Sequence, residues 1–380
     1  MFIELHVIQN FAPSNLNRDD TGNPKDAEFG GVRRARVSSQ CFKRAIREAP
    51  VFAETTTAEP GARTRRAVAL LKAPLSETGK PEDEINAVLE YFVPKYLGKL
   101  EGKLADDVRT KVMVFISPAE VETIADALLE HWDELLAKDS RVKARRSLIR
   151  ELTKKFKNVT SAPDIALFGR MLAQKPVLNI DAACQVAHAL STHRVTMEMD
   201  FWTAVDDLKA LEEDPDAGAG GMGFTGFDSA CFYRYICLDW GQLLENLNGD
   251  IGLARNTVKA FLRAVVEAVP SGKQNAFAAH NPPNFMLAAV REGSFGWSLV
   301  NAFERPVRPQ AGSGLVAPSV EALDTYWQRL TEVYGTDSVV ATSALVLDPE
   351  LTLEALATDT APNLDTWINT IMAKLPGEEA

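Results

Sequence analysis

The stretch Ala230–Leu238, ACFYRYICL, carries the clearest strand pattern in the sequence. Successive side chains of a strand point to opposite faces of a sheet. The odd-numbered positions from Cys231 to Cys237 would therefore line one face, and the even-numbered positions the other. The segments on either side of this strand decide the fold to which it belongs.

Strands and helices surround this segment in a recognisable order. Phe2–Asn10 alternates apolar side chains and predicts a strand, and a loop rich in Asn, Asp, Pro and Gly follows it. RVSSQCFKRAIREA, at 36–49, predicts a helix capped by Ser38 or Ser39. Further along, we expect strands over 185–193 and 285–290, and helices over 242–247, 253–269, 320–334 and 364–372.

Residues 50 to about 180 have a helical character. Pro81–Tyr96 is one amphipathic run, and Ser117-Pro118-Ala119-Glu120 is a capping box with proline in the first turn of a second helix. The order strand, helix, helical insertion, strand, strand, helix, strand is that of a ferredoxin-like or RNA-recognition-motif (RRM) fold. We therefore predict an α+β fold, with an RRM-like core that carries a helical insertion.

Composition excludes several classes of protein. The chain has 380 residues, 46% of them hydrophobic and 24% charged, which indicates a soluble globular protein of two or three domains. Its four cysteines form no CxxC pair, so a disulfide-stapled secreted domain is not expected. The segment MFIELHVIQN lacks the pattern expected of a signal peptide, and no apolar run approaches the roughly 20 residues of a spanning helix. We expect a cytoplasmic protein without a membrane partner.

The net charge of -11 hides two basic blocks. Residues 33–47 hold six basic side chains and no acidic one, and residues 141–157 hold eight basic side chains beside Glu151 alone. A strongly acidic chain that keeps two such blocks has segregated its charge, which is typical of a polyanion-binding face. Two solvated helix faces are the alternative explanation.

The short motifs of enzymes and metal sites are absent or lack their context. Residues 218–223 match G-x-G-x-x-G, but an acidic run precedes them and a strand follows, so we interpret them as the turn of a protruding hairpin. The five histidines show neither HExxH nor zinc spacing, and we expect them in the core or at the surface. Loop acids such as Asp26 are more often turn formers than metal ligands. The sequence predicts no catalytic site, no cofactor and no metal.

The segment Thr196–Trp202, TMEMDFW, places two methionines and two aromatic residues at one end of this hairpin. Such side chains either pack against the body of the protein or form a wedge that unstacks a base of a bound single strand. The segment alone leaves both interpretations open.

Five blocks of the sequence resemble one family. They are PSNLNRDD…KDAEFGGVRRARVSSQCFKRAIR (13–47), PDIALFGRM (163–171), THRVTMEMDFWTAVDDL (192–208), FYRYICLDWGQLLENLNG (232–249) and PSGKQNAFAAHNPP (270–283). Together they resemble the CasC family, the repeated backbone subunit of the type I-E CRISPR Cascade complex within the Cas-seven superfamily.

The resemblance implies a hand-shaped organisation. The palm would comprise residues 1–49, 181–193 and 227–380, the helical fingers 50–180 and the thumb hairpin 194–226. Copies of such a subunit line up along a CRISPR guide RNA (crRNA) and present it for pairing with target DNA in antiviral defence. The implied partners are the crRNA, target DNA, further copies of the chain and the other Cascade subunits (large, small, tail and crRNA-processing).

The resemblance also implies which residues contact RNA. They are Arg18, Arg33, Arg34, Arg36, Ser38, Gln40, Lys43, Arg44, Arg47, Arg170, Met171, Phe201, Trp202, Lys273, Gln274 and Asn275, with Phe201 and Trp202 as the thumb wedge. Possible nucleic-acid contacts in the fingers are Arg141, Lys143, Arg145 and Arg146. The implied function is non-catalytic. The alternative is a metal-dependent, RNA-cleaving backbone subunit that uses Asp26, because other members of the superfamily cut target RNA with an aspartate of the first long loop.

Overall fold

A computed structural model describes residues 1–102, 108–137, 141–204, 221–293, 295–309, 312 and 314–377. The chain divides into two compact units. Unit 1 comprises Met1–Ala49, Val186–Cys237 and Leu262–Lys374; unit 2 comprises Pro50–Gln185, Leu238–Phe261 and the residues from Leu375 on. The palm, finger and thumb boundaries given above stay a prediction.

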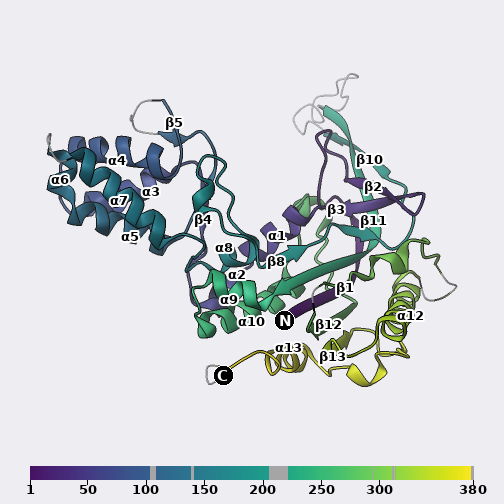
Figure 1. The fold of residues 1–380 in the computed structure, drawn as a ribbon. Coiled ribbons are helices and arrows are strands. Elements are labelled where there is room, and N and C mark those ends of the chain that lie inside the picture. Colours follow the sequence, from purple (N-terminus) through teal and green to yellow (C-terminus); the bar gives the residue numbers. More distant parts are fainter. Residues whose placement is uncertain are drawn as a thin grey trace, which may run out of the picture. The chain divides into compact units, whose positions relative to one another are not determined.

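A twisted antiparallel sheet organises unit 1 (Figure 1). Its strands follow the order β13-β12-β1-β11-β9-β3-β2, and β10 pairs with the outer part of β11. Their bounds are β1 (Phe2–Ser14), β2 (Asp26–Phe29), β3 (Val32–Val37), β9 (Ala189–Ser191), β10 (Glu198–Ala204), β11 (Gly221–Asp239), β12 (Phe285–Arg291) and β13 (Val339–Val346). The first strand thus pairs with one that lies almost 300 residues later, in the register Phe2 with Arg291.

Helices cover this sheet and close two apolar cores. They are α1 (Ser39–Glu48), α11 (Gln274–Phe277), α12 (Val316–Tyr334) and α13 (Leu364–Met372), while α10 (Ile251–Glu267) belongs to both units. Phe42 of α1 packs with Phe11 and Phe232, and Leu323 and Trp327 of α12 belong to a second cluster. The α+β fold class predicted from the sequence is confirmed.

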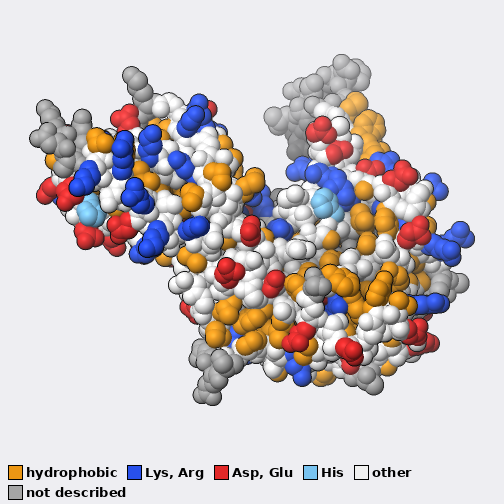
Figure 2. All heavy atoms as spheres, viewed as in Figure 1, with side chains coloured by type: hydrophobic (Ala, Val, Ile, Leu, Met, Phe, Trp, Pro, Cys, Tyr) orange, Lys and Arg blue, Asp and Glu red, His pale blue; other side chains and the backbone are white. Residues whose placement is uncertain are grey.

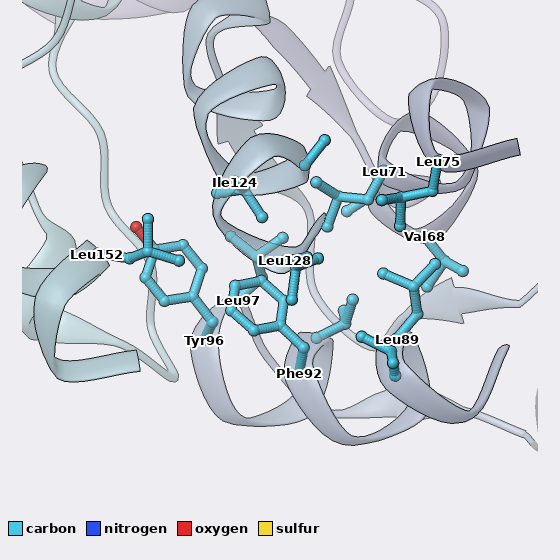
Figure 3. Packing of buried hydrophobic residues seen from close by; sticks show 14 of the residues in the cluster. Val68, Leu71, Leu75, Leu89, Phe92, Tyr96, Leu97, Ile124, Leu128 and Leu152 are labelled. Atoms are coloured by element: carbon cyan, nitrogen blue, oxygen red, sulfur yellow. The ribbon is translucent and has the colours of Figure 1, made fainter. Parts of the chain in front are cut away.

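Unit 2 is mainly helical. Its helices are α2 (Pro50–Thr56), α3 (Ala67–Glu77), α4 (Glu82–Tyr96), α5 (Pro118–Glu130), α6 (Trp132–Leu136), α7 (Arg141–Lys155), α8 (Pro163–Phe168) and α9 (Trp240–Asn246). Short ladders pair β4 (Ala62–Thr64) with β7 (Val114–Ile116) and β5 (Leu100–Glu101) with β6 (Arg109–Thr110). Leu71, Leu89, Phe92 and Leu128 meet in its core (Figure 3). The Ser117 hydroxyl accepts a hydrogen bond from the Glu120 amide at 3.0 Å, which confirms the predicted cap of α5.

Some predicted elements differ from the structure. The segment expected as a loop after Asn10 contains the end of β1 and strand β2, which forms a hairpin with β3 through a turn at Gly30-Gly31, where both φ angles are positive. The strand expected over 185–193 is two short strands, β8 (Cys184–Val186) and β9. Residues 205–220, which include half of the glycine-rich segment 218–223, lie outside the described residues. No helix among those described is long and apolar enough to cross a membrane.

Candidate nucleic-acid interface

The first basic block begins on strand β3, whose alternation gives its arginines different environments. Arg33 is exposed and forms an ion pair with Asp26. Arg34 is fully buried, and its guanidinium donates to the carbonyl oxygens of Phe29, Ser191 and Phe303 at 2.7–3.1 Å. These carbonyls occupy its donors inside the protein, so the prediction that Arg34 contacts RNA is wrong.

The first turn of α1 follows directly. Ser38 is the N-cap residue, is largely buried and makes no side-chain capping bond; its amide donates to Asn17 Oδ1 at 2.9 Å. No acidic side chain lies in the first turn, and Gln40 is exposed there. The start of α1 therefore keeps the partial positive charge of a helix N-terminus uncompensated by its own side chains.

Three basic residues lie further along α1. Arg44 is exposed and binds Glu48 at 2.9 Å, while Arg47 is half-buried with its guanidinium 3.6 Å from the same carboxylate. Lys43 lies on the helix between Gln40 and Arg47, with intermediate exposure. A surface ion pair between neighbouring turns is worth only about 0.5 kcal/mol, so the Glu48 contact leaves Arg44 available to a stronger anion.

Loops from distant parts of the chain meet at this helix start. Gly272 fits against the backbone of Asn15 and Leu16 so closely that a Cβ there would lie 2.3 Å from the Leu16 carbonyl oxygen. The next residue, Lys273, is exposed in the left-handed region with φ 50°. Asn275 is also exposed, whereas the Gln274 amide nitrogen donates to the carbonyl oxygen of Pro270 at 2.9 Å. Residues 15–17 thus bring the loop of Lys273 beside the first turn of α1.

The same first loop supports the base of the hairpin β10–β11. Asn15 Nδ2 donates to the Gly226 carbonyl at 2.9 Å and to the Gly22 carbonyl at 3.0 Å. Arg18 is exposed in this loop, where its backbone bridges Pro24. The hairpin, the first loop and the start of α1 therefore form one connected part of unit 1.

The hairpin presents two different faces. In its register Phe201 pairs with Phe224, Thr203 with Met222 and Trp202 with Gly223. Directly paired residues share a face, so the exposed apolar side chains on one face are Met199, Phe201, Met222 and Phe224. We call this set the apolar hairpin face; hydrophobic side chains are visible along the hairpin in Figure 2.

Trp202 lies on the opposite face of the hairpin. A Cβ at Gly223 would lie 2.6 Å from a carbon of the Trp202 ring, so the ring rests across that glycine. Trp202 and Phe201 are about equally exposed, at 48% and 53%. The two side chains therefore lie on opposite faces of the hairpin, and the thumb wedge of Phe201 and Trp202 stays a prediction.

Arg170 and Met171 of unit 2 are adjacent but differ completely in exposure. Arg170 is buried; its guanidinium binds Glu120 at 2.7 Å and donates to the Leu178 carbonyl at 2.9 Å. Burial is the main cause that raises the pKa of Glu120, and Arg170 opposes it. The prediction that Arg170 contacts RNA is therefore wrong, whereas Met171 is 81% exposed.

The second basic block lies on α7. Lys143, Arg146, Arg150 and Lys154 are exposed at spacings of three or four residues, so they form one stripe along the helix. Arg145 instead places its guanidinium 4.4 Å from the centre of the Tyr91 ring. Arg141 begins the helix, and its side chain is outside the described set. Lys and Arg side chains gather over these helices in Figure 2.

Sequence reasoning missed several groups in unit 1. His188 is exposed beside Arg36, and Asp228 lines a small pocket with Asp26 and Met197. Burial, and secondly the charge of Asp26, raises the pKa of Asp228 to about 7. No cluster of three or more potential metal-ligating side chains occurs in the described part of the chain. His188 lies between β8 and β9, and Asp228 lies within β11, so only the sheet register shows what each side chain faces.

Comparisons with known proteins agree with this architecture. Residues 3–370 match the model of the family described as CT1975-like protein. A chain of a solved structure titled "CRISPR RNA-guided surveillance complex, pre-nicking" is 32% identical, with a TM-score of 0.82 and coverage of 98% of this chain and 99% of that one. A chain of another "CRISPR RNA-guided surveillance complex" is 26% identical, with a TM-score of 0.73 and coverage of 99% and 100%. No curated protein matches. Because the family model spans nearly the whole sequence, the chain belongs to the CT1975-like protein family.

Proposed function

We propose that this chain is the non-catalytic, crRNA-binding backbone subunit of a type I-E CRISPR Cascade complex. The observation that carries the proposal is the connected face of unit 1, where the start of α1, the loop of Lys273 and the hairpin meet. The similarity to chains of CRISPR RNA-guided surveillance complexes over nearly the full length supports the same role.

The chemistry of this face suits an RNA backbone of any sequence. Gln40, Lys43, Arg44 and Lys273 offer amide, ammonium and guanidinium donors, and a helix N-terminus attracts anions. Such donors bind phosphates without reading bases. A backbone subunit needs contacts of this kind, because pairing between guide and target carries the sequence information.

The apolar hairpin face is the part suited to displace a nucleotide. Four exposed apolar side chains on a two-stranded hairpin are costly in water unless a ligand covers them. Aromatic side chains stack on bases for about 1–3 kcal/mol each. We assign the wedge to Phe201 and Phe224, whose rings lie 5.1 Å apart, and give Trp202 a supporting role across Gly223.

The stripe on α7 suits a second polyanion. Its four exposed cations make no ion pair with an acid of the described residues. We propose that it contacts the backbone of nucleic acid in the assembled complex, including target DNA during R-loop formation. Copies of the chain would form a helical filament along the guide with the other Cascade subunits, in the cytoplasm.

Recovery of bound RNA tests this function. Nucleic acid extracted from the purified full-length chain should be small guide RNA of uniform length. Recovery of no RNA, or of RNA of random length, would contradict the proposal. The variant Arg44→Glu should lower RNA recovery, whereas the control variant Glu332→Gln, on α12, should not.

One observation is a reason to test the alternative function, metal-dependent RNA cleavage, as well. Asp26 lies near a second carboxyl, that of Asp228, although Arg33 also binds Asp26. The assembled complex should therefore be incubated with complementary RNA and Mg²⁺. Intact RNA supports the non-catalytic role, whereas cleavage that Asp26→Asn abolishes supports the alternative.

A further inference from the structure

The side chain of Arg36 is held at two points. Its Nε donates to the backbone carbonyl oxygen of Asp26 at 3.0 Å, and its Nη1 lies 2.9 Å from Nδ1 of His188. An arginine guanidinium carries five N–H donors, so these two bonds fix its orientation and leave other donors for a ligand.

The second contact defines the state of the histidine. Arginine donates only, so Nδ1 of His188 must be the acceptor, and the ring is neutral with its proton on Nε2. The surroundings favour that state, because burial and then the charges of Arg36 and Lys25 lower the pKa of His188. The exposed ring thus retains one N–H donor, on Nε2.

Sheet pairing brings these residues together. Arg36 of β3 pairs with Leu190 of β9, and His188 lies two residues before Leu190, the distance of a diagonal neighbour on the same face. The Arg36 amide donates to the Lys25 carbonyl at 2.9 Å, and the Lys25 amide donates to the Asn17 carbonyl at 2.9 Å. Asn17 also binds Ser38 at the start of α1, so the group continues the surface described above.

The charges around His188 define the ligand that fits. Arg36 on β3 and Lys25 before β2 are the two charged groups that act on the ring. The Asp26 backbone carbonyl accepts the hydrogen bond from Arg36, while the Asp26 carboxylate binds Arg33. Two cations and one neutral N–H donor, with no acid paired to them among the described residues, form a site for a phosphate.

We propose that Lys25, Arg36 and His188 form a phosphate site, in which His188 is a positioning residue that orients Arg36 through Nδ1. The ligand is a backbone phosphate of bound RNA, which rests on the proposed function. The role assigned to His188 is that of an acceptor rather than a cation, and these two roles predict opposite results for substitutions.

Four variants of the full-length chain separate these roles. Asn carries Oδ1 near the place of Nδ1, so His188→Asn should keep RNA affinity within about twofold. His188→Ala, His188→Gln and His188→Lys lose the acceptor at that place and should weaken binding roughly threefold to tenfold, the range of one net hydrogen bond. The probe is a single-stranded RNA oligonucleotide of arbitrary sequence, with His131→Ala in unit 2 as the control.

The pattern of results decides the question. If His188→Lys binds as well as or better than the wild type and His188→Asn is as weak as His188→Ala, His188 acts through charge and the inference is wrong. The double variant Arg36→Ala with His188→Ala should lose less binding free energy than the sum of the two single losses, because both substitutions remove the same oriented guanidinium. If the wild type fails to bind RNA, the proposed function itself fails.

Nitrogen-15 NMR provides a readout that does not depend on affinity. His188 should show protonated Nε2 and unprotonated Nδ1 at pH 7, and a protonated Nδ1 would overturn the assignment. Addition of the RNA should shift the His188 signals at micromolar concentration. If inorganic phosphate produces the same shift at the same concentration, the site takes free phosphate and the assignment to RNA is wrong.

Discussion

Asp228 should make the protein less stable as the pH rises through neutrality. The residue is only 8% exposed, and no hydrogen bond from the described residues compensates the charged form of its carboxyl. Burial and the neighbouring Asp26 raise its pKa from 3.8 to about 7. In the unfolded chain the carboxyl ionises near pH 4, while in the folded chain it keeps its proton to about pH 7.

The size of the effect follows from this interval. Between pH 4 and pH 7 the unfolded state binds fewer protons than the folded state, so stability falls as the pH rises and levels off above pH 7. The difference between the unfolded pKa of 3.8 and the folded pKa of about 7 corresponds to a loss of about 4 kcal/mol at most in the free energy of unfolding. Asp228→Asn removes the ionisation and keeps the shape, so it should stabilise the protein by about 2–4 kcal/mol at pH 8 and by little at pH 4.

The assay is urea unfolding of the wild type and Asp228→Asn between pH 4 and pH 8.5. Asp20→Asn is the matched control, because it removes the same charge from an exposed residue of the first loop. Carbon-13 NMR of the Asp228 carboxyl measures its titration directly, and Asp26→Asn should lower that pKa. A stability difference that is the same at pH 4 and pH 8, or a carboxyl that titrates near pH 4, would refute the reasoning.

Four other variants test the roles assigned to the predicted site residues. Phe201→Ala should weaken RNA binding by up to about 1–3 kcal/mol, whereas Trp202→Ala should reduce hairpin order first, as limited proteolysis and chemical probing of the guide would show. If Phe201→Ala and Trp202→Ala change the chemical probing of the guide equally, the different roles assigned to the two hairpin faces are contradicted. Lys43→Glu with Arg47→Glu should lower the log-log salt slope of binding to single-stranded RNA by roughly 0.7 for each lost phosphate contact, and an unchanged slope would exclude that role. Arg170→Ala should cost about 3–5 kcal/mol of stability, measured by urea unfolding, because Glu120 would remain buried without its partner.

The sequence predicted the long elements well because their patterns are local. The helix expected over 364–372 and the strand expected over 285–290 have almost the bounds observed. Strand β2 escaped because its four residues are surrounded by Asn, Asp, Pro and Gly, which give the segment the composition of a loop. Strand β13 was missed although its β-branched run, VVATSALV, carried a usable signal.

The site was harder to predict because function depends on which face a side chain occupies. Arg33 and Arg34 look equivalent in a basic block, yet one is exposed and the other binds three carbonyl groups inside the protein. The partner of Arg170 lies 50 residues away, so no local pattern shows that pair. The opposite faces of Phe201 and Trp202 could have been deduced, because adjacent strand residues always diverge.

The basic residues of this chain therefore divide by the acceptors that the fold supplies. Arg34 and Arg170 are surrounded by carbonyl or carboxylate oxygens, so their charge stabilises the protein and is unavailable outside. Arg36 receives a carbonyl oxygen and a neutral imidazole nitrogen, acceptors that fix its direction without cancelling its charge. An arginine held by neutral acceptors loses little freedom when a phosphate arrives, so more of the interaction appears as affinity. Partly exposed basic side chains that neutral groups orient are thus better candidates for RNA contacts than buried ones such as Arg34, whose donors are taken up by carbonyl oxygens inside the protein.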